Sequence, residues 1–555
     1  MTTVDWIVLV GTLGFIVGYG AWRSRGVRSM DDYVLGGNTL KWPTIGLSIM
    51  ATQASAITFL STPGQAYEDG MRFVQFYFGL PLAMVVISAV FVPVYYRLKV
   101  YTAYEYLEHR FDARVRYLGA VLFLIQRGLA AGITIYAPSI ILSSILGWPL
   151  EPTIWVMGAG VVIYTVAGGS RAVAITQKHQ MVVMMAGLVI AAVVVVLRLP
   201  DGVSLPAAVR LAGALDRMNV ASFDIDFASR YNFWSGLLGG FFLAMSYFGT
   251  DQSQVQRYLS GQSIAESRLG LLFNGMFKVP MQFVILFIGV MVFVFYLFVR
   301  PPVFFNPPTL AKVAASEKAP ELAGLERRWD EALDKQRAAA TGFVAALDGP
   351  GEAGARAELR AAHAATADLR KEARALVARA APGAETRDSD YIFISFVLGY
   401  MPMGLIGLLI AVIFCAAMSS ISSELAALGA TSSSDLYMRL RGRTHEQGGV
   451  RVSKLFTVLW GAIAIGFATY ASLLDNLIQA VNILGSIFYG TILGLFVVAF
   501  FIRHVTATPV LIGALVAQST VLALFFLSDI GFLWYNVIGC AIVVVVSLVL
   551  QLFRR

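Results

Sequence analysis

The chain has 555 residues, of which 57% are hydrophobic and 14% are charged, a composition that excludes an ordinary soluble globule and indicates a polytopic membrane protein. The formal net charge of +8 does not require a nucleic acid partner, because cytoplasmic loops of membrane proteins are enriched in lysine and arginine. Both cysteines, Cys415 and Cys540, lie in apolar runs, which argues against a disulfide framework or a metal cluster.

Hydropathy predicts about thirteen helices that span a lipid bilayer. The predicted spans are 4–22, 43–66, 73–96, 117–146, 152–167, 180–198, 233–250, 270–299, 391–418, 453–471, 475–502, 508–527 and 532–552. The first run has arginines after it and no obvious cleavage site, so we expect a retained span and not a signal peptide. Basic residues are dense in 97–116 and 439–454 and sparse on the opposite side, which predicts a cell membrane protein with its N-terminus outside and its C-terminus in the cytoplasm.

The second predicted span, 43–66, is small and polar at its centre. Residues 50–56 read Met-Ala-Thr-Gln-Ala-Ser-Ala, with hydroxyls and an amide but no bulky aliphatic anchor. Because hydrocarbon cannot satisfy these groups, this part of the span must face protein or water. From these residues alone two interpretations are open, a tightly packed helix interface or a binding site near the middle of the membrane.

A second irregular span, 233–250, lies five spans further along the chain. It contains Gly236, Gly239 and Gly240 and continues into the polar run 246–252. Two interrupted spans at this separation are what two five-helix repeats of opposite orientation would produce.

The segment 406–424 carries the most specific pattern, an apolar run that ends in CAAMSSISSE. Neighbouring hydroxyls on a membrane helix can bond to the preceding turn of the same helix. A reversible site for a monovalent cation instead requires neutral oxygens, which the hydroxyls of Ser419 and Ser420 and the free carbonyls of a broken helix would supply. The pattern favours the ion site.

Residues 309–390 interrupt the succession of spans. About a third of them are charged, and apolar residues recur at three- and four-residue steps on both sides of Gly349-Pro350-Gly351. This periodicity predicts two amphipathic helices in a hairpin on the outer face, and the alternative is a flexible charged insertion. We therefore divide the chain into a first part of the transmembrane core (1–308), an extracytoplasmic helical hairpin (309–390) and a second part of the core (391–555). Nothing in these residues identifies a protein partner for the hairpin.

Five segments together resemble the solute:sodium symporter family. They are GGNTLKWPTIGLSIMATQASAITFLSTPGQAYEDG, VYTAYEYLEHRF, GGSRAVAITQKHQ, QVQRYLSG and AAMSSISSELAALGATSSSDLY. The resemblance covers the predicted spans and leaves out 309–390. It implies an all-α LeuT-type fold, with a 5+5 inverted repeat, one leading helix and two trailing helices. It also implies sodium-coupled uptake of a small organic solute by alternating access.

The resemblance further implies which residues bind the sodium ion and which bind the solute. The sodium ion would be held by main-chain oxygens of Ala51, Ala54 and Ala416 and by the hydroxyls of Ser419 and Ser420. The solute pocket would be lined by Gln53, Ser55, Thr58, Gln75, Tyr77, Tyr247, Phe248, Gln479 and Asn482. Independently of the family, Lys278 is a candidate for the solute site because it is an ionisable residue within a span, unless its long side chain reaches the cytoplasmic surface.

The chain departs from the family pattern at two places. Family members that bind a second sodium ion often have an acid where this chain has Gln177, so a second site beside Ser422 and Ser423 is doubtful. The positions that bind sugar in galactose-type members are Thr58 and Tyr77, which disfavours a galactose-like solute. A neutral sugar or polyol, an amino acid and a small carboxylate are otherwise open.

Asp251 and Arg257 are expected to form part of an inner gate, where an exposed ion pair would be worth under ~1 kcal/mol and a pair that is buried on closing would be worth more. The main alternative to a transporter is a membrane receptor or sensor that uses the same fold, with the hairpin as its partner-binding element. An enzyme is not expected, because no nucleophile and base are paired within the spans. A channel is disfavoured because no ring of acids or carbonyl filter motif is visible.

Overall fold

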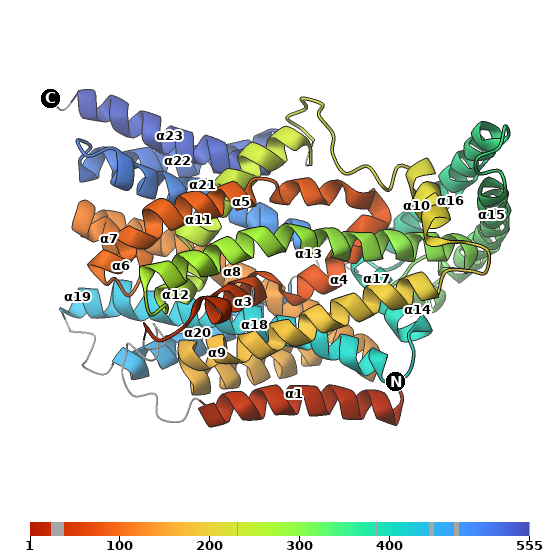
Figure 1. Ribbon diagram of the computed structural model, residues 1–555, viewed down its shortest axis with the longest axis horizontal. Coiled ribbons are helices and arrows are strands. Elements are labelled where there is room, and N and C mark those ends of the chain that lie inside the picture. The colour runs from red at the N-terminus through yellow and green to blue at the C-terminus, as the bar shows by residue number, and fades with distance from the viewer. Residues whose placement is uncertain (24–37, 230, 383–385, 443–448, 471–476, 554–555) are drawn as a thin grey trace.

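The computed structural model describes residues 1–23, 38–229, 231–382, 386–442, 449–470 and 477–553. Within these ranges the chain is helical, and its only β-structure is an isolated bridge between Leu40 and Gly261. Long helices run beside one another along the longest axis of the molecule, and two helices, α15 (Ala319–Ala345) and α16 (Glu352–Ala380), stand at one end of it (Figure 1). The predicted all-α class is confirmed.

The predicted span 43–66 is a broken helix. Helix α3 (Trp42–Gln53) ends at Ala54, where the backbone has φ −84° and ψ 74°, and α4 (Ala56–Asp69) starts after Ser55, whose backbone is extended. The interruption falls within the run of small polar residues that the sequence singled out. Main-chain groups near this break are therefore released from helical hydrogen bonding inside the protein.

The rest of the first half surrounds this break. It consists of α1 (Thr3–Arg23), the 3-10 helix η2 (Gly70–Tyr77), α5 (Leu80–Val86), the π-helical turn η3 (Ile87–Phe91), α6 (Val92–Leu98), α7 (Ala103–Arg110), α8 (Ala113–Leu146) and α9 (Leu150–Leu197). Helix α8 begins where the Asp112 carboxylate accepts hydrogen bonds from the main-chain N–H groups of Arg114 and Val115.

Helix α9 folds back on itself. The hydroxyls of Tyr164 and Thr176 are 2.6 Å apart, although residues twelve positions apart lie about 18 Å apart along a straight helix. Its two apolar arms, Leu150–Val166 and Val173–Leu197, correspond to the two spans predicted at 152–167 and 180–198.

The second irregular span is also broken. The loop before it contains α10 (Leu205–Ala214). The broken span itself consists of the π-helical turn η4 (Ser235–Gly239), α11 (Gly240–Gly249) and α12 (Gln252–Leu259), and the long α13 (Ile264–Phe298) follows it. Helical geometry stops at Thr250 and Asp251, and the Asp251 carboxylate then caps α12 by accepting a hydrogen bond from the Ser253 N–H. Helix α12 packs against α3 and α18 (Leu405–Thr431), so both interrupted helices contact α18.

The predicted span 391–418 is wrong as a single helix. The chain forms α17 (Ser389–Tyr400) and then α18, because Met401 is extended before Pro402 and Gly404 has a φ of +82°, a value that favours glycine. Ser419 and Ser420 consequently lie in the middle of α18. The remaining helices are η5 (Ser432–Met438), α19 (Arg439–Arg441), α20 (Gly449–Ala468), α21 (Leu477–Phe501), α22 (Ala507–Leu527) and α23 (Leu533–Leu552).

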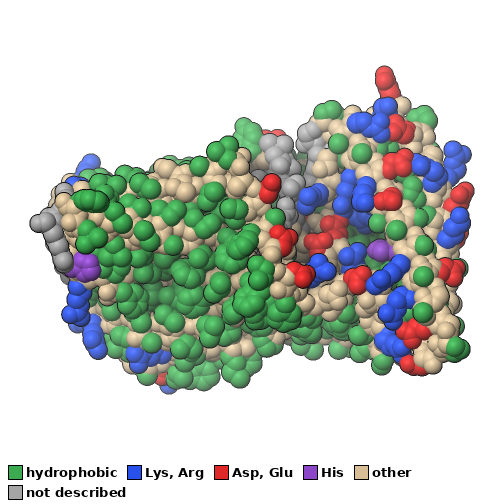
Figure 2. Space-filling view, turned by 90° about the horizontal axis from the view of Figure 1, so that it is seen from above, with side chains coloured by type: hydrophobic (Ala, Val, Ile, Leu, Met, Phe, Trp, Pro, Cys, Tyr) green, Lys and Arg blue, Asp and Glu red, His purple; other side chains and the backbone are tan. Residues whose placement is uncertain are grey.

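The inserted segment forms the predicted hairpin, preceded by the short α14 (Pro307–Ala314). Helices α15 and α16 pack through their apolar faces, with Leu322, Leu325 and Trp329 on one helix and Leu376 and Val377 on the other in one buried cluster. Hydrophobic side chains cover the main body, whereas charged side chains cover the hairpin and a hollow beside it (Figure 2). The hairpin therefore differs from the body in the surface that it presents.

Nine helices of the described chain are long and apolar enough to cross a membrane, and five shorter apolar helices accompany them. The short ones include α17 and Ser235–Gly249, the first part of the second broken helix. Interrupted spans divide into segments below the length that a continuous span requires. The helical content is thus that of a polytopic membrane protein, as the composition predicted.

Candidate functional site

Helix α18 contacts the end of α3 through its paired serines. The Ser419 hydroxyl donates a hydrogen bond to the Ala51 carbonyl oxygen at 2.8 Å, and the Ser420 hydroxyl donates to the Thr52 carbonyl oxygen at 3.0 Å. These carbonyls belong to the last turn of α3, where no later helical N–H is available to them. All four residues are buried.

The oxygens at this junction fit a small monovalent cation. Ala51, Ala54 and Ala416 are fully buried, and their small side chains allow the helix backbones to approach closely. The donor set consists of neutral carbonyl and hydroxyl oxygens, which suit a hard ion that must bind and leave repeatedly. Clusters of three or more His, Cys, Asp or Glu suited to a metal ion are absent from the described residues.

The side-chain amide of Gln177 occupies the neighbouring group of oxygens. Its Nε2 lies 3.0 Å from Thr52 Oγ1, 2.9 Å from Ser419 Oγ, 3.1 Å from the Ser419 carbonyl oxygen and 2.7 Å from Ser423 Oγ. Its Oε1 accepts a hydrogen bond from the Ser48 hydroxyl. A nitrogen donor therefore sits among four oxygens from α3 and α18.

A cavity of about 90 Å³ lies beside the serine pair. Six of the predicted solute residues line it: Gln53, Ser55, Thr58, Tyr77, Tyr247 and Asn482. The buried atoms Gln53 Oε1 and Asn482 Nδ2 have no hydrogen-bond partner among the residues described. The cavity thus offers an acceptor and a donor to a small solute.

The comparisons with known proteins agree with one another. A profile of the Sodium:solute symporter family matches residues 33–326 and 366–517. The chain is 28% identical to Sodium-coupled monocarboxylate transporter 1 of Xenopus laevis, over 93% of this chain and 70% of that protein. It is 25% identical to the Sodium/sialic acid symporter NanT of Aliivibrio fischeri, over 98% and 92% of the two chains. It is 35% identical to the human Sodium/iodide cotransporter, over 50% and 43%.

The chain belongs to the sodium:solute symporter family. It is a sodium-coupled symporter and not an enzyme, and sodium is its coupling ion. A solved structure of a Na⁺-coupled sialic acid symporter, with substrate bound in an outward-open state, matches it with a TM-score of 0.77 over 100% of this chain and 98% of that one, at 23% identity. This match shows that the LeuT-type fold is shared. The family profile skips 327–365, the central part of the hairpin.

Three residues predicted to line the solute pocket of this symporter lie away from the cavity. Gln75 accepts a hydrogen bond from the Ser222 N–H at 2.9 Å, so it holds a loop instead. Phe248 is buried with its ring edge-on to Tyr247, at 4.8 Å between the ring centroids. Gln479 donates to Gln65 Oε1 at 3.1 Å.

Lys278 lies deep within the symporter and not at its surface. Its side chain is fully buried on α13, and its Nζ lies 5.6 Å from the centroid of the Tyr77 ring, which lines the cavity. The Nζ has no hydrogen-bond partner within the described chain. The possibility that this side chain reaches the cytoplasmic surface is therefore excluded.

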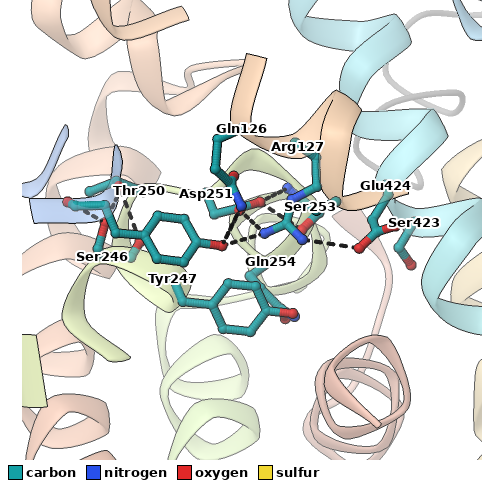
Figure 3. A network of polar contacts seen from close by, with 12 residues as sticks. Gln126, Arg127, Ser246, Tyr247, Thr250, Asp251, Ser253, Gln254, Ser423 and Glu424 are labelled. Atoms are coloured by element: carbon teal, nitrogen blue, oxygen red, sulfur yellow. Dashed lines mark hydrogen bonds and ion pairs between the residues drawn. The ribbon is translucent and has the colours of Figure 1, made fainter. Parts of the chain in front are cut away.

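A buried charge network closes one side of the cavity (Figure 3). Arg127 of α8 pairs with Asp251 at the second helix break and with Glu424 of α18 at 3.0 Å, and its guanidinium also meets the Tyr489 hydroxyl at 2.5 Å. Tyr247 lies below the same guanidinium, at 5.3 Å from its ring centroid. Residues from four helices, α8, α11, α18 and α21, are thereby linked across the break.

Of the two residues expected in an inner gate, Asp251 pairs with Arg127, whereas the Arg257 side chain donates to the Ser253 carbonyl oxygen at 3.4 Å. Both residues are buried, which is the second of the two cases that the sequence left open. Sequence analysis missed Arg127, Glu424 and Tyr489. Arg127 lies inside the predicted span 117–146, and Glu424 lies on α18, six residues after the predicted span 391–418. A charged residue within a membrane helix is the signal that would have identified both.

Proposed function

We propose that this symporter imports a small monovalent carboxylate together with one sodium ion. Sodium is held by the carbonyls of Ala51, Ala54 and Ala416 and the hydroxyls of Ser419 and Ser420. The solute occupies the cavity lined by the six residues named above, from Gln53 to Asn482. Alternating access then exposes the cavity to one side of the membrane at a time.

The single observation that carries the charge of the solute is the buried Nζ of Lys278, which has no partner in the described chain and lies 5.6 Å from the centroid of the Tyr77 ring on the cavity wall. An unpaired charge in a protein interior within the membrane is costly, and a carboxylate is the partner that offsets this cost. The relatives named above are, by their names, transporters of monocarboxylates, sialic acid and iodide, all of them anions. A neutral sugar would leave the ammonium without a counter-ion.

The number of sodium ions follows from Gln177. Its Nε2 already lies within 3.0 Å of the hydroxyl oxygens of Thr52, Ser419 and Ser423, where a second cation would need free lone pairs and a nearby carboxylate. One sodium ion and one carboxylate carry no net charge, so the membrane potential does not drive their transport. A tenfold sodium gradient then supports about tenfold accumulation, compared with roughly 500-fold for a neutral solute at ~100 mV.

The orientation that we propose is N-terminus outside and C-terminus in the cytoplasm of the cell, in the cell membrane. The N-terminus lies at the end of the molecule that carries the hairpin, and the C-terminus lies at the opposite end (Figure 1). The basic segments around α7 and α19 also lie at the end away from the hairpin (Figure 1). The positive-inside rule then assigns the hairpin to the outer face.

Purified protein in proteoliposomes tests this function with labelled pyruvate as the probe. We expect an inward sodium gradient to drive uptake equally at zero potential and at a potassium diffusion potential of ~100 mV. Lys278→Met removes the counter-charge and abolishes this uptake, whereas sodium still protects the variant against thermal unfolding. Uptake that rises several-fold with the potential, or that survives in Lys278→Met, overturns the proposal.

A further inference from the structure

A second cavity, of about 250 Å³, lies between the hairpin and the nearby ends of α4 and α13. We call it the vestibule. Its acidic, basic and histidine lining consists of Glu68, Asp69, Arg217, His363, Arg370, Lys371 and Arg374. The hollow beside the hairpin, where basic, acidic and histidine side chains gather, is visible in Figure 2.

The lining of the vestibule has an excess of positive charge. Four cationic side chains face two carboxylates there. Behind the wall, the buried Asp388 accepts hydrogen bonds from Arg370 at 2.8 Å and from Arg374 at 3.0 Å, and Glu68 pairs with both arginines. These carboxylates compensate Arg370 and Arg374, and Lys371 pairs with Asp368 at 2.9 Å, so Arg217 is the one vestibule cation left without a direct ion pair in the described chain.

Arg217 is the vestibule cation that makes no direct ion pair among the described residues. Asp69, Glu68 and Asp216 lie near enough to attract its charge, but its buried Nε has no hydrogen-bond partner. Its guanidinium lies 4.9 Å from the centroid of the Phe293 ring, and one Nη is 3.4 Å from His363 Nε2. Burial lowers the pKa of Arg217 from its ordinary value, although the nearby carboxylates, Asp69 first among them, act in the opposite direction.

Other nitrogen atoms around the vestibule also have no acceptor. Arg370 Nη1, Arg374 Nε and His363 Nδ1 are buried and without hydrogen-bond partners in the part of the chain that the structure describes. Burial, followed by the charge of Arg217, lowers the pKa of His363 to about 4, so this ring is neutral at pH 7. Guanidinium N–H groups in a fixed fork are the donors that match a carboxylate.

A third cavity lies between residues of the vestibule and the helix that lines the solute cavity. It has a volume of about 400 Å³, shares Asp69 and Arg217 with the vestibule and is lined by Gln479. Gln479 lies three residues before Asn482 on α21, and Asn482 lines the solute cavity. Arg217 thus lines both the vestibule and this third cavity.

We propose that the vestibule binds a small carboxylate anion on its way to the solute cavity, with Arg217 as its principal ligand. The hairpin builds this site, and Gln336 and His363 in its lining fall in the stretch that the family profile does not match. The inference that this anion is the transported solute rests on the proposed function. The inference that the vestibule binds an anion does not. The expected effect is a higher local concentration of solute at the mouth of the transport route.

The test is thermal unfolding of the full-length protein in sodium-free buffer, with potassium pyruvate as the probe and potassium chloride at equal ionic strength as the reference. The background variant carries Ser420→Ala and Lys278→Met, which silence the solute cavity. We expect pyruvate to raise the unfolding midpoint of this background. Adding Arg217→Gln should require at least tenfold more pyruvate for the same shift, whereas Arg217→Lys should retain most of it.

Arg210→Gln is the matched control, because Arg210 pairs with Asp348 and Glu352 outside the vestibule. It should respond to pyruvate as the background does. The proposal is overturned if the background shows no shift, if chloride gives the same shift, or if Arg217→Gln behaves like Arg210→Gln. The proposed function fails separately, when proteoliposomes take up no pyruvate although the vestibule binds it.

Discussion

The sodium assignment can be tested at the hydroxyl of Ser420. In Ser420→Ala the bond to the Thr52 carbonyl is lost, together with one of the two hydroxyl oxygens offered to the ion. A polar contact to a charged group contributes about 1.5–3 kcal/mol, which corresponds to a roughly 10- to 150-fold change in binding. We therefore expect the sodium concentration for half-maximal uptake to rise by roughly 10- to 150-fold.

The assay is initial uptake of pyruvate in proteoliposomes as a function of sodium concentration. With a single sodium site the activation curve is hyperbolic, so the Hill coefficient stays near one in both proteins. The maximal rate at saturating sodium should change much less than the half-saturating concentration, because the solute cavity keeps its other residues.

Ser422→Ala is the control on the same helix. The Ser422 hydroxyl donates to the Ser419 carbonyl oxygen at 3.1 Å, one turn back along α18, and contributes no oxygen to the proposed cage. Its removal should leave sodium activation unchanged. Equal sodium activation in Ser420→Ala and Ser422→Ala would refute the assignment of the serine pair to the ion.

Three further outcomes are expected. Arg127→Met leaves two buried acids without a positive partner, so it should destabilise the protein by about 3–5 kcal/mol, and adding Asp251→Asn and Glu424→Gln should restore the thermal midpoint. Gly289→Ala places a Cβ against the Pro63 carbonyl oxygen and should lower the midpoint of thermal unfolding, unlike Gly160→Ala at an open position of α9. The neutral His363 contributes stability above pH ~6.5 that is lost as the pH falls toward about 4, so protease cleavage of the hairpin should increase over this range and less so in His363→Gln.

Burial, followed by the charge of Arg217, fixes the sign of that pH dependence, because both disfavour a positive charge on His363. The other charged groups that line the vestibule are Glu68, Asp69, Arg370, Lys371 and Arg374. Cleavage that is independent of pH between 4 and 6.5, or equal in both proteins, contradicts the expectation.

Local residue chemistry predicted the two helix breaks and the hairpin. A run of small polar residues cannot face lipid, and a three- and four-residue apolar period on a charged segment has few other outcomes. These features depend on neighbours in the chain, so the sequence alone contains them. The end of α17 was missed because hydropathy averages over Pro402 and Gly404, although both interrupt a helix.

The charge network could not be predicted because its members are distant in the chain. Arg127 and Glu424 are separated by 297 positions, and only the packing of α8 against α18 brings them together. The role of Gln75 was misassigned for the same reason, since its partner Ser222 lies in a loop 147 residues away. Gln177 was recognised as a departure from the family, but its bonds to two other helices follow from the fold.

The length of the hairpin has a practical consequence. Helix α15 has 27 residues and is about 40 Å long, and its companion is tied by ion pairs to Glu68 at the end of α4. A tilt of ~10° at the base would displace the tip by about 7 Å, so small rearrangements of the first broken helix are magnified there. Both native cysteines are buried, and a side chain at Gly351 meets nothing within 4 Å. A fluorescent dye attached to Gly351→Cys would therefore report movements of the first broken helix during the transport cycle.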